Sequence, residues 1–167
     1  ELRVLILSAG KIDNELAKIF GEIPSGLIPL NGKPVIFRII DKLIDEGFEK
    51  ISITVGYKKE ILEQIVKQQY KNQCELEFIS TDFKKPPGNS IKTATNNCNE
   101  GKLLIILGDT LIENNLIDLV NKGKNFVITS QEFSHTKNWC VVTKRENEIE
   151  EIFDKEELAN NGKYHAL

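Results

Sequence analysis

The sequence has no methionine, a single tryptophan and only three cysteines among its 167 residues. Cys74, Cys98 and Cys140 are odd in number, far apart and without a Cys-x-x-Cys pair, which argues against a disulfide framework and against a zinc site. We therefore expect a reducing, cytoplasmic environment, with the cysteines as buried apolar side chains. No hydrophobic run approaches the ~20 residues that a membrane-spanning helix needs, so no membrane partner is expected.

A strong excess of charge of either sign is also missing. The 22 Lys and Arg residues nearly balance the 25 Asp and Glu residues, for a formal net charge of -3. Such a balance gives no general attraction to nucleic acid or to an anionic membrane surface. The partners that remain are small molecules and proteins, and the hydrophobic fraction of 40% is ordinary for a globular chain.

Two familiar phosphate-binding motifs are absent. A dinucleotide fingerprint requires Gly-x-Gly-x-x-Gly after the first strand, and only Gly10 is found there. A P-loop requires Gly-x-x-x-x-Gly-Lys-Ser/Thr, and the nearest match runs from Gly26 to Lys33, with one residue too many and Pro34 in place of the hydroxyl. Both of these modes of nucleotide binding are excluded.

The first two thirds of the chain alternate between short apolar runs and segments of helical periodicity. The expected strands are 2–7, 51–55, 76–80 and 103–107, and the expected helices are 14–20, 34–46, 59–69, 90–98 and 116–122. Asp13 is the expected N-cap of the first helix, and Ile61, Leu62 and Ile65 are expected to face inward from the third. This alternation predicts a Rossmann-like α/β fold, a mostly parallel sheet flanked by helices and joined by right-handed crossovers.

The last third of the chain is rich in strands without intervening helices. Residues 126–129, 140–143 and 149–153 are the expected strands, and the final segment from Tyr164 to Leu167 reads as the beginning of another. We expect one α/β domain over residues 1–167. The missing methionine and the apolar final segment lead us to expect that this domain is incomplete at its C-terminus.

The ends of the four parallel strands are where chemistry is expected. They read 8–11 (Ser-Ala-Gly-Lys), 56–58 (Gly-Tyr-Lys), 80–82 (Ser-Thr-Asp) and 108–110 (Gly-Asp-Thr). Open parallel sheets bind ligands beyond the carboxyl ends of their strands, so these ends should meet at one edge. Asp109 is the candidate metal ligand there; the alternative is that its carboxylate only caps the turn after its strand.

Four motifs at these positions resemble those of a known family. The first strand ends in Leu7-Ser8-Ala9-Gly10, residues 24–34 read Pro-Ser-Gly-Leu-Ile-Pro-Leu-Asn-Gly-Lys-Pro, Gly88-Asn89-Ser90 precedes a helix, and an apolar strand ends in Gly108-Asp109. In this order and spacing, they resemble the nucleotidyltransferases that join a nucleoside triphosphate to a sugar phosphate or a related phosphate. The resemblance covers most of the chain and weakens after Asp109.

The resemblance implies a fold of the nucleotide-diphospho-sugar transferase type and a reaction in which a substrate phosphate attacks the α-phosphorus and releases pyrophosphate. It implies Asp109 and Lys11 as catalytic residues, with Mg²⁺ as the cofactor bound by Asp109. The backbone of Ala9 and Gly10 would lie against base and ribose. The residues that the resemblance implies for nucleotide binding are Ser8, Ala9, Gly10, Thr81, Gly88, Asn89 and Ser90.

This chain departs from the family pattern in two places. The family's Gly-Thr-Arg loop is replaced by residues 11–15 (Lys-Ile-Asp-Asn-Glu), and the family's lysine after the first proline of the second motif is Ser25. Lys11 would replace the arginine as a point charge, or the helix after Asp13 would present backbone N–H groups to an anion. Two simpler interpretations remain open: Lys11 is a solvated surface lysine, and Asn89 is an ordinary helix N-cap.

Three functions are compatible with these residues. The first is an active, Mg²⁺-dependent nucleotidyltransferase making precursors of polysaccharide or glycolipid, with a nucleoside triphosphate and a phosphorylated small molecule as partners, as a homo-oligomer or fused to another domain. The second is an inactive relative that binds a nucleotide or sugar nucleotide and regulates, as Ser25 and the altered loop suggest. The third, a glycosyltransferase, usually has two carboxylates one residue apart, whereas residues 109–111 hold only Asp109.

Overall fold

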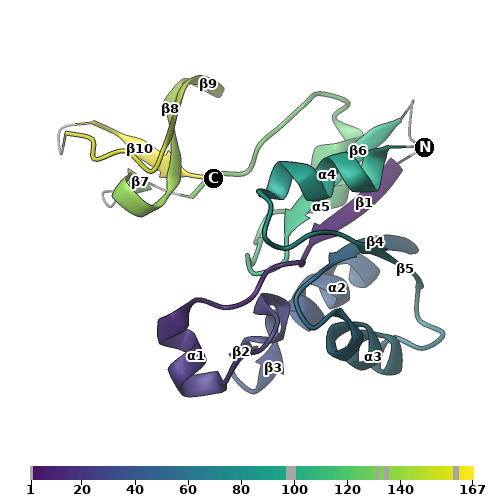
Figure 1. Cartoon of the computed structure of the whole chain (residues 1–167). Coiled ribbons are helices and arrows are strands. Elements are labelled where there is room, and N and C mark those ends of the chain that lie inside the picture. The colour runs from purple at the N-terminus through teal and green to yellow at the C-terminus, as the bar shows by residue number, and fades with distance from the viewer. Residues whose placement is uncertain (1, 97–100, 131, 134–135, 160–161) are drawn as a thin grey trace. The chain divides into compact units, whose positions relative to one another are not determined.

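The computed structural model describes residues 2–96, 101–130, 132–133, 136–159 and 162–167 (Figure 1). The chain forms two compact units, Glu1–Lys122 and Gly123–Leu167. The boundary falls where the sequence changes from alternating helices and strands to strands alone. The single domain expected over residues 1–167 stays a prediction. Among the described residues, no helix has the length and apolar character to cross a membrane.

The first unit is built on a parallel sheet. Its strands are β1 (Leu2–Leu7), β4 (Lys50–Val55), β5 (Glu75–Ser80) and β6 (Lys102–Leu107), in the order β5-β4-β1-β6. All three pairings are parallel, and β1 is central because its residues pair with β4 on one side and β6 on the other. Val4, Leu5 and Ile6 are buried, as expected for a strand covered on both faces. The predicted parallel sheet is confirmed.

Helices flank this sheet and position its loops (Figure 1). They are α1 (Asn14–Phe20), α2 (Val35–Asp45), α3 (Lys59–Gln69), α4 (Pro87–Thr95) and α5 (Leu116–Asn121). The crossovers through α2 and α3 run in one direction along the sheet, and the crossover through α4 runs in the opposite direction. Right-handed connections therefore place α4 on the opposite face from α2 and α3, and α4 packs against β1.

The inward face of α3 differs from the sequence prediction. Leu62 and Val66 are fully buried, whereas Ile61 is 46% exposed and Ile65 is 36% exposed. Leu62, Val66 and Tyr70 are four residues apart and form one stripe along the helix. The prediction of Ile61 and Ile65 as core residues was wrong. Both lie on a second apolar stripe of α3, next to the stripe that is buried. α2 begins at Val35, with Pro34 as its N-cap, one residue later than predicted.

β6 is buried on one face only. Leu104 and Ile106 are 6% and 2% exposed, whereas Leu103, Ile105 and Leu107 are each at least 40% exposed. In the described sheet β6 has β1 as its neighbour and forms the edge. The most apolar strand of the sequence is thus half-covered in this structure.

The second unit is a four-stranded antiparallel sheet. Its order is β7 (Glu132–Phe133), β10 (Tyr164–Ala166), β8 (Cys140–Arg145) and β9 (Glu148–Asp154). The strand predicted at the end of the chain is confirmed as β10. The strand predicted over 126–129 is wrong, because those residues have no strand partner in the described part of the chain. Cys74 and Cys140 are free, as expected, but half-buried rather than buried; Cys98 lies outside the described residues.

The end of α2 is joined to the start of α5 by Glu46. Its Oε2 accepts hydrogen bonds from Leu116 N at 2.7 Å and Ile117 N at 3.0 Å, and its Oε1 pairs with Lys42 Nζ at 2.7 Å. Burial raises the pKa of this carboxyl, but the Lys42 partner and the two backbone amides outweigh burial and leave the pKa below its ordinary value of 4.5. The charged form of Glu46 therefore stabilises the folded state.

Replacing Glu46 with glutamine is expected to lower the free energy of unfolding by about 1–2 kcal/mol at pH 7, because hydrogen bonds to a charged group are lost. A lowered folded-state pKa contributes stability above the unfolded pKa, and that stability disappears as the pH falls through the folded value. The free energies of unfolding of the wild-type and Glu46→Gln proteins, measured in urea, should therefore approach each other as the pH falls below 4.5. Glu60→Gln on α3 is the matched control, and an equal loss in both variants would contradict the assignment.

Candidate functional site

The carboxyl ends of the four parallel strands meet at one edge, as predicted. Backbone hydrogen bonds continue past the strands: Gly108 N to Leu7 O at 2.8 Å, Ser8 N to Thr54 O at 3.2 Å, Tyr57 N to Ala9 O at 2.8 Å, and Thr81 N to Val55 O at 2.8 Å. The loop after each strand is therefore fixed to the loop or strand beside it. This edge holds the strand-end residues singled out from the sequence.

Two glycines make this close approach possible. A Cβ on Gly108 would lie 2.6 Å from Leu7 O and 2.8 Å from Ser8 Cβ. A Cβ on Gly56 would lie 2.9 Å from Ala9 O and 3.0 Å from Thr81 O. Side chains at these positions would force the loops apart, so glycine is required for packing at both.

The loop after β1 is buried at its start and open at its end. Ser8 is 1% exposed, Ala9 is 8% exposed and Gly10 is half-exposed. The Ser8 hydroxyl is buried without a hydrogen-bond partner in the described part of the molecule, next to the positions where a Cβ on Gly26 or Gly108 would lie. A ligand at the edge would meet Ala9 and Gly10 before Ser8.

Lys11 and α1 form the next part of the chain. Lys11 is exposed and pairs with Pro24 through a single β-bridge. Asp13 is the N-cap, as predicted: its Oδ1 accepts from Glu15 N and Leu16 N, both at 2.9 Å. These two N–H groups are occupied by a carboxylate, so the alternative in which α1 offers them to a bound anion is not supported.

Ser25 lies directly beside this loop. Its backbone N donates to Gly10 O at 3.1 Å, and its hydroxyl lies 3.9 Å from the position of a Cβ on Gly10. A short 3-10 turn, η1 (Ser25–Leu27), holds it there, followed by the two-residue strands β2 (Pro29–Leu30) and β3 (Lys33–Pro34). The side chain at position 25 is therefore at the candidate site, where a cation would be close to a ligand on Gly10.

Thr81 and the start of α4 are also brought together. Thr81 Oγ1 and Ser90 Oγ lie 3.0 Å apart and share a hydrogen bond. α4 begins at Pro87 with Pro86 as its N-cap, so the interpretation of Asn89 as the N-cap is wrong; Asn89 N instead donates to Pro86 O at 2.9 Å. The predicted start at residue 90 was late because proline at the first helical position was read as loop. Gly88 is exposed, with open space around it.

Asp109 is exposed at the end of β6, and no hydrogen bond or ion pair of its carboxylate is found among the described residues. A turn cap would accept a nearby backbone N–H, so this alternative has no support. The described residues contain no cluster of three or more His, Cys, Asp or Glu side chains suited to a metal. A single carboxylate fits Mg²⁺, which takes its remaining ligands from substrate phosphates and water.

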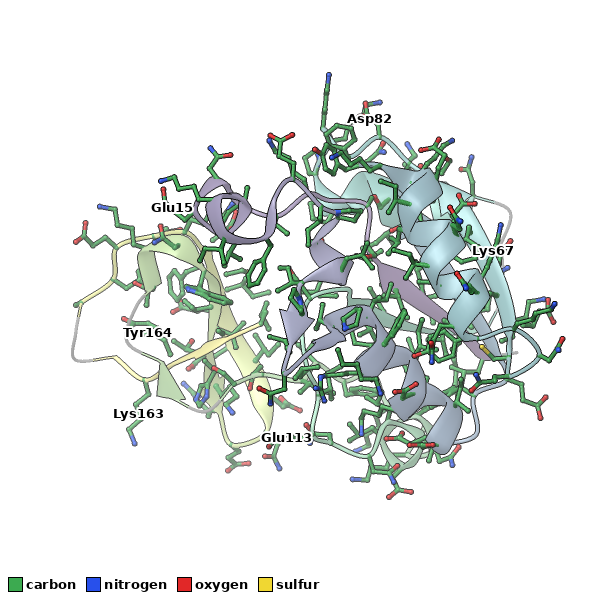
Figure 2. All side chains as sticks on the ribbon, turned by 90° about the horizontal axis from the view of Figure 1, so that it is seen from below. Glu15, Lys67, Asp82, Glu113, Lys163 and Tyr164 are labelled. Carbon is green, nitrogen blue, oxygen red and sulfur yellow. The ribbon has the colours of Figure 1, made fainter. Side chains whose placement is uncertain are left out.

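Tyr57 and Phe83 were not recognised from the sequence as site residues. Their rings make a T-shaped contact, with centroids 5.4 Å apart and planes at 70°. Tyr57 Oη donates to Glu22 Oε2 at 3.2 Å, and Lys58 Nζ donates to Glu22 O at 2.6 Å. The available signal was an aromatic residue within three positions of each of two strand ends. Figure 2 shows Asp82, the neighbour of Phe83, on the same upper side of the first unit as Glu15 on α1.

Comparison with protein families gives one match over nearly the whole chain. The model of a family described as nucleotidyl transferase matches residues 4–164. This range includes every strand-end residue named above.

Two relatives match the chain over only part of their own length. A UTP–glucose-1-phosphate uridylyltransferase, AglF, from Haloferax volcanii is 27% identical over 163 residues, which cover 93% of this chain and 66% of that protein. A bifunctional protein GlmU from Methanococcus aeolicus is 32% identical over 152 residues, covering 90% of this chain and 35% of that protein. The chain thus spans from about a third to two thirds of the length of these relatives.

A solved structure confirms the fold. HddC from Yersinia pseudotuberculosis, in complex with GMP-PN, aligns with a TM-score of 0.72 at 20% identity, over 98% of this chain and 72% of that one. The central parallel sheet flanked by helices and the antiparallel C-terminal sheet are therefore those of the nucleotide-diphospho-sugar transferase fold, as the motifs predicted.

Proposed function

This chain belongs to the nucleotidyl transferase family, and on that premise we propose that it joins a nucleoside triphosphate to a phosphorylated small molecule and releases pyrophosphate. The observation that carries the proposal is the exposed carboxylate of Asp109, for which no partner is found in the described part of the chain. It stands at the same edge as Ala9, Gly10 and Thr81, where an open parallel sheet binds its ligand.

The edge offers a place for each part of a nucleotide. Ala9 and Gly10 present backbone to the base and ribose, and the hydroxyls of Thr81 and Ser90 are fixed to each other near the base edge. Gly88 adds open space at the start of α4. Transfer of this type asks little covalent chemistry of the protein, so positioning and charge stabilisation account for most of the rate.

Asp109 is the residue that would hold Mg²⁺. When bound, the ion would neutralise negative charge on the phosphates and the leaving pyrophosphate. Lys11 is the exposed cation in the loop after β1, and its flexible side chain would approach the phosphates as a point charge. The attacking group is an oxygen of the second substrate's phosphate, which needs alignment rather than deprotonation by a base.

The substrate classes are drawn from the relatives. The Haloferax volcanii relative is a UTP–glucose-1-phosphate uridylyltransferase, and a Campylobacter jejuni relative, 24% identical over 169 residues, is a heptose 1-phosphate guanylyltransferase. The first name pairs a nucleoside triphosphate with a sugar 1-phosphate, and the second pairs guanylyl transfer with a sugar 1-phosphate. We assign the same two classes to this chain, with a cytoplasmic role in making precursors of polysaccharide or glycolipid.

Pyrophosphate release tests the proposal directly. The protein is incubated with Mg²⁺ and each of ATP, CTP, GTP and UTP, together with glucose 1-phosphate, mannose 1-phosphate, N-acetylglucosamine 1-phosphate or phosphocholine. We expect pyrophosphate with at least one pair and none when the second substrate is omitted. No turnover over the whole panel, with a folded protein, would count against an enzyme.

A second function, nucleotide binding without catalysis, is favoured by one observation. Ser25 stands beside Gly10, at the position of the family's lysine, so the site lacks a cation there. This function predicts saturable binding of a triphosphate in calorimetry with no pyrophosphate release. The same observation suggests a variant that separates the two functions.

Ser25→Lys is expected to raise kcat about tenfold or more, because a cation beside the phosphates stabilises charge that develops in the transition state. Ser25→Gln, long but uncharged, is the matched control and should not increase kcat. The measurement is the steady-state rate of pyrophosphate release. A Ser25→Lys protein no faster than the glutamine control would show that position 25 does not limit the rate.

A further inference from the structure

An aromatic pair, Tyr57 and Phe83, stands at the edge where the nucleotide is placed. Phe83 belongs to the polar segment between β5 and α4 and is 37% exposed. Large apolar side chains lose free energy by remaining in water. Exposed apolar side chains also occur elsewhere on this chain, so the feature that distinguishes Phe83 is its place at the strand-end edge, beside residues assigned to the nucleotide.

Phe83 lies next to Gly56, at the end of β4. A Cβ on Gly56 would lie 3.0 Å from Phe83 Cβ, 3.0 Å from Thr81 O and 2.9 Å from Ala9 O. The phenylalanine side chain, Thr81 and Ala9 therefore surround the same point at the end of β4. Ala9 and Thr81 are two of the residues assigned to the nucleotide, so the Phe83 side chain lies beside that site.

The ring of Phe83 is held by Tyr57. The two rings pack edge to face with centroids 5.4 Å apart, a geometry that aromatic pairs favour. Tyr57 is fixed at both ends: its backbone N donates to Ala9 O at 2.8 Å, and its hydroxyl donates to Glu22 at 3.2 Å. The pair is therefore preorganised before any ligand arrives, which lowers the entropy cost of binding.

We propose that Phe83 is the stacking surface for the nucleobase and that Tyr57 is the residue that positions it. The inference rests on the proposed nucleotide function and adds the residue that binds the base. A nucleobase has a flat π-face that stacks on aromatic rings, whereas the phosphates and the sugar offer no such face. Two nearby charged groups already have partners: Asp82 Oδ1 accepts from Lys84 N, and Lys58 Nζ donates to Glu22 O.

Calorimetry with two kinds of probe tests the assignment. The wild-type protein and the Phe83→Leu variant are titrated, in Mg²⁺, with each of ATP, CTP, GTP and UTP and separately with inorganic triphosphate, which has no base. We expect Phe83→Leu to weaken the preferred nucleotide about fivefold or more and to leave inorganic triphosphate unchanged. Phe83→Tyr keeps the ring and should retain nucleotide affinity.

Two further variants sharpen the test. Phe126→Leu is the matched control, since Phe126 has the same side chain at 36% exposure in the second unit, and it should bind as the wild type does. Tyr57→Leu removes the ring that holds Phe83 and should weaken nucleotide binding without affecting inorganic triphosphate. Tyr57→Phe keeps that ring but loses the hydrogen bond to Glu22, so its nucleotide affinity should lie between those of Tyr57→Leu and the wild type.

The outcomes separate this inference from the proposed function. If the wild type binds a nucleotide and Phe83→Leu binds it equally well, the stacking role is overturned and the nucleotide site remains. If Phe83→Leu weakens inorganic triphosphate as much as nucleotide, the effect is a general one on the loop and the stacking role is also overturned. If the wild type binds none of the four nucleotides, the proposed function fails and the stacking role fails with it.

Discussion

Asp109→Ala is expected to reduce the rate of pyrophosphate release by about 10³-fold. A metal ion at a transferring phosphoryl group contributes several kcal/mol of transition-state stabilisation, and each ~1.4 kcal/mol is a factor of ten in rate. The carboxylate is exposed and has no partner among the described residues, so its removal should leave the free energy of unfolding within about 0.5 kcal/mol of the wild type. Asp109→Ala is therefore expected to lower the activity without lowering the stability of the fold.

The measurement is steady-state kinetics over a range of Mg²⁺ concentrations, with urea unfolding alongside. Asp45→Ala is the matched control, because Asp45 is exposed at the C-terminal end of α2, away from the carboxyl ends of the strands. Asp45→Ala should keep wild-type kinetics. An Asp109→Ala protein that retains full activity, at every Mg²⁺ concentration, would remove the basis of the proposed metal site.

Gly108→Ala is expected to lower the free energy of unfolding by about 3 kcal/mol. The added methyl group would lie 2.6 Å from Leu7 O and within 3 Å of two atoms of Ser8, in a buried position. Leu7 O also accepts the hydrogen bond from Gly108 N at 2.8 Å, so relief of the clash requires β1 and β6 to separate where they are joined. Of these three atoms only the Ser8 hydroxyl oxygen could rotate away, whereas Leu7 O and Ser8 Cβ are fixed by the backbone.

Gly88→Ala provides the control for this prediction. Nothing lies within 4 Å of a Cβ on Gly88, and the residue is inside α4. Alanine there should be neutral or stabilising by up to about 1 kcal/mol, since alanine favours helix over glycine. Urea unfolding of both variants gives the comparison, and equal stability of the two would contradict the packing argument at Gly108.

Much of the first unit was predictable because its strands are buried. The apolar runs predicted both ends of β1 correctly and predicted the ends of β4, β5 and β6 to within one residue. A continuous apolar run bounded by glycine or polar residues has few structural solutions in a chain of this size. The same reasoning correctly predicted that the strand ends share an edge, since that follows from parallel topology alone.

The wrong predictions of secondary structure and burial have physical causes that are not visible in the sequence pattern. Residues 126–129 have the composition of a strand but no partner in the described structure, and strand formation depends on pairing. Ile61 and Ile65 have the right period but lie on the stripe next to the buried one. Asn89 suits an N-cap, but proline at residue 87 starts the helix earlier.

The strand-end residues of the candidate site could be predicted from the sequence, but the contacts between its loops could not. Asp109, Ala9 and Gly10 follow from motif order. The contact of Ser25 with Gly10 and that of Tyr57 with Phe83 join loops that are distant in sequence. Such contacts are set by the crossover geometry, which the residue pattern specifies only in outline.

The carboxylate of Glu46 also bears on the order in which the chain folds. It binds the first amides of α5, which lie 70 and 71 residues further along. A helix of six residues is too short to be stable by itself in water, and a contact over such a sequence distance must first overcome the entropy of closing a long loop. α5 can therefore persist only after α2 and the strands between them have come together, which makes it a late element of the folding reaction.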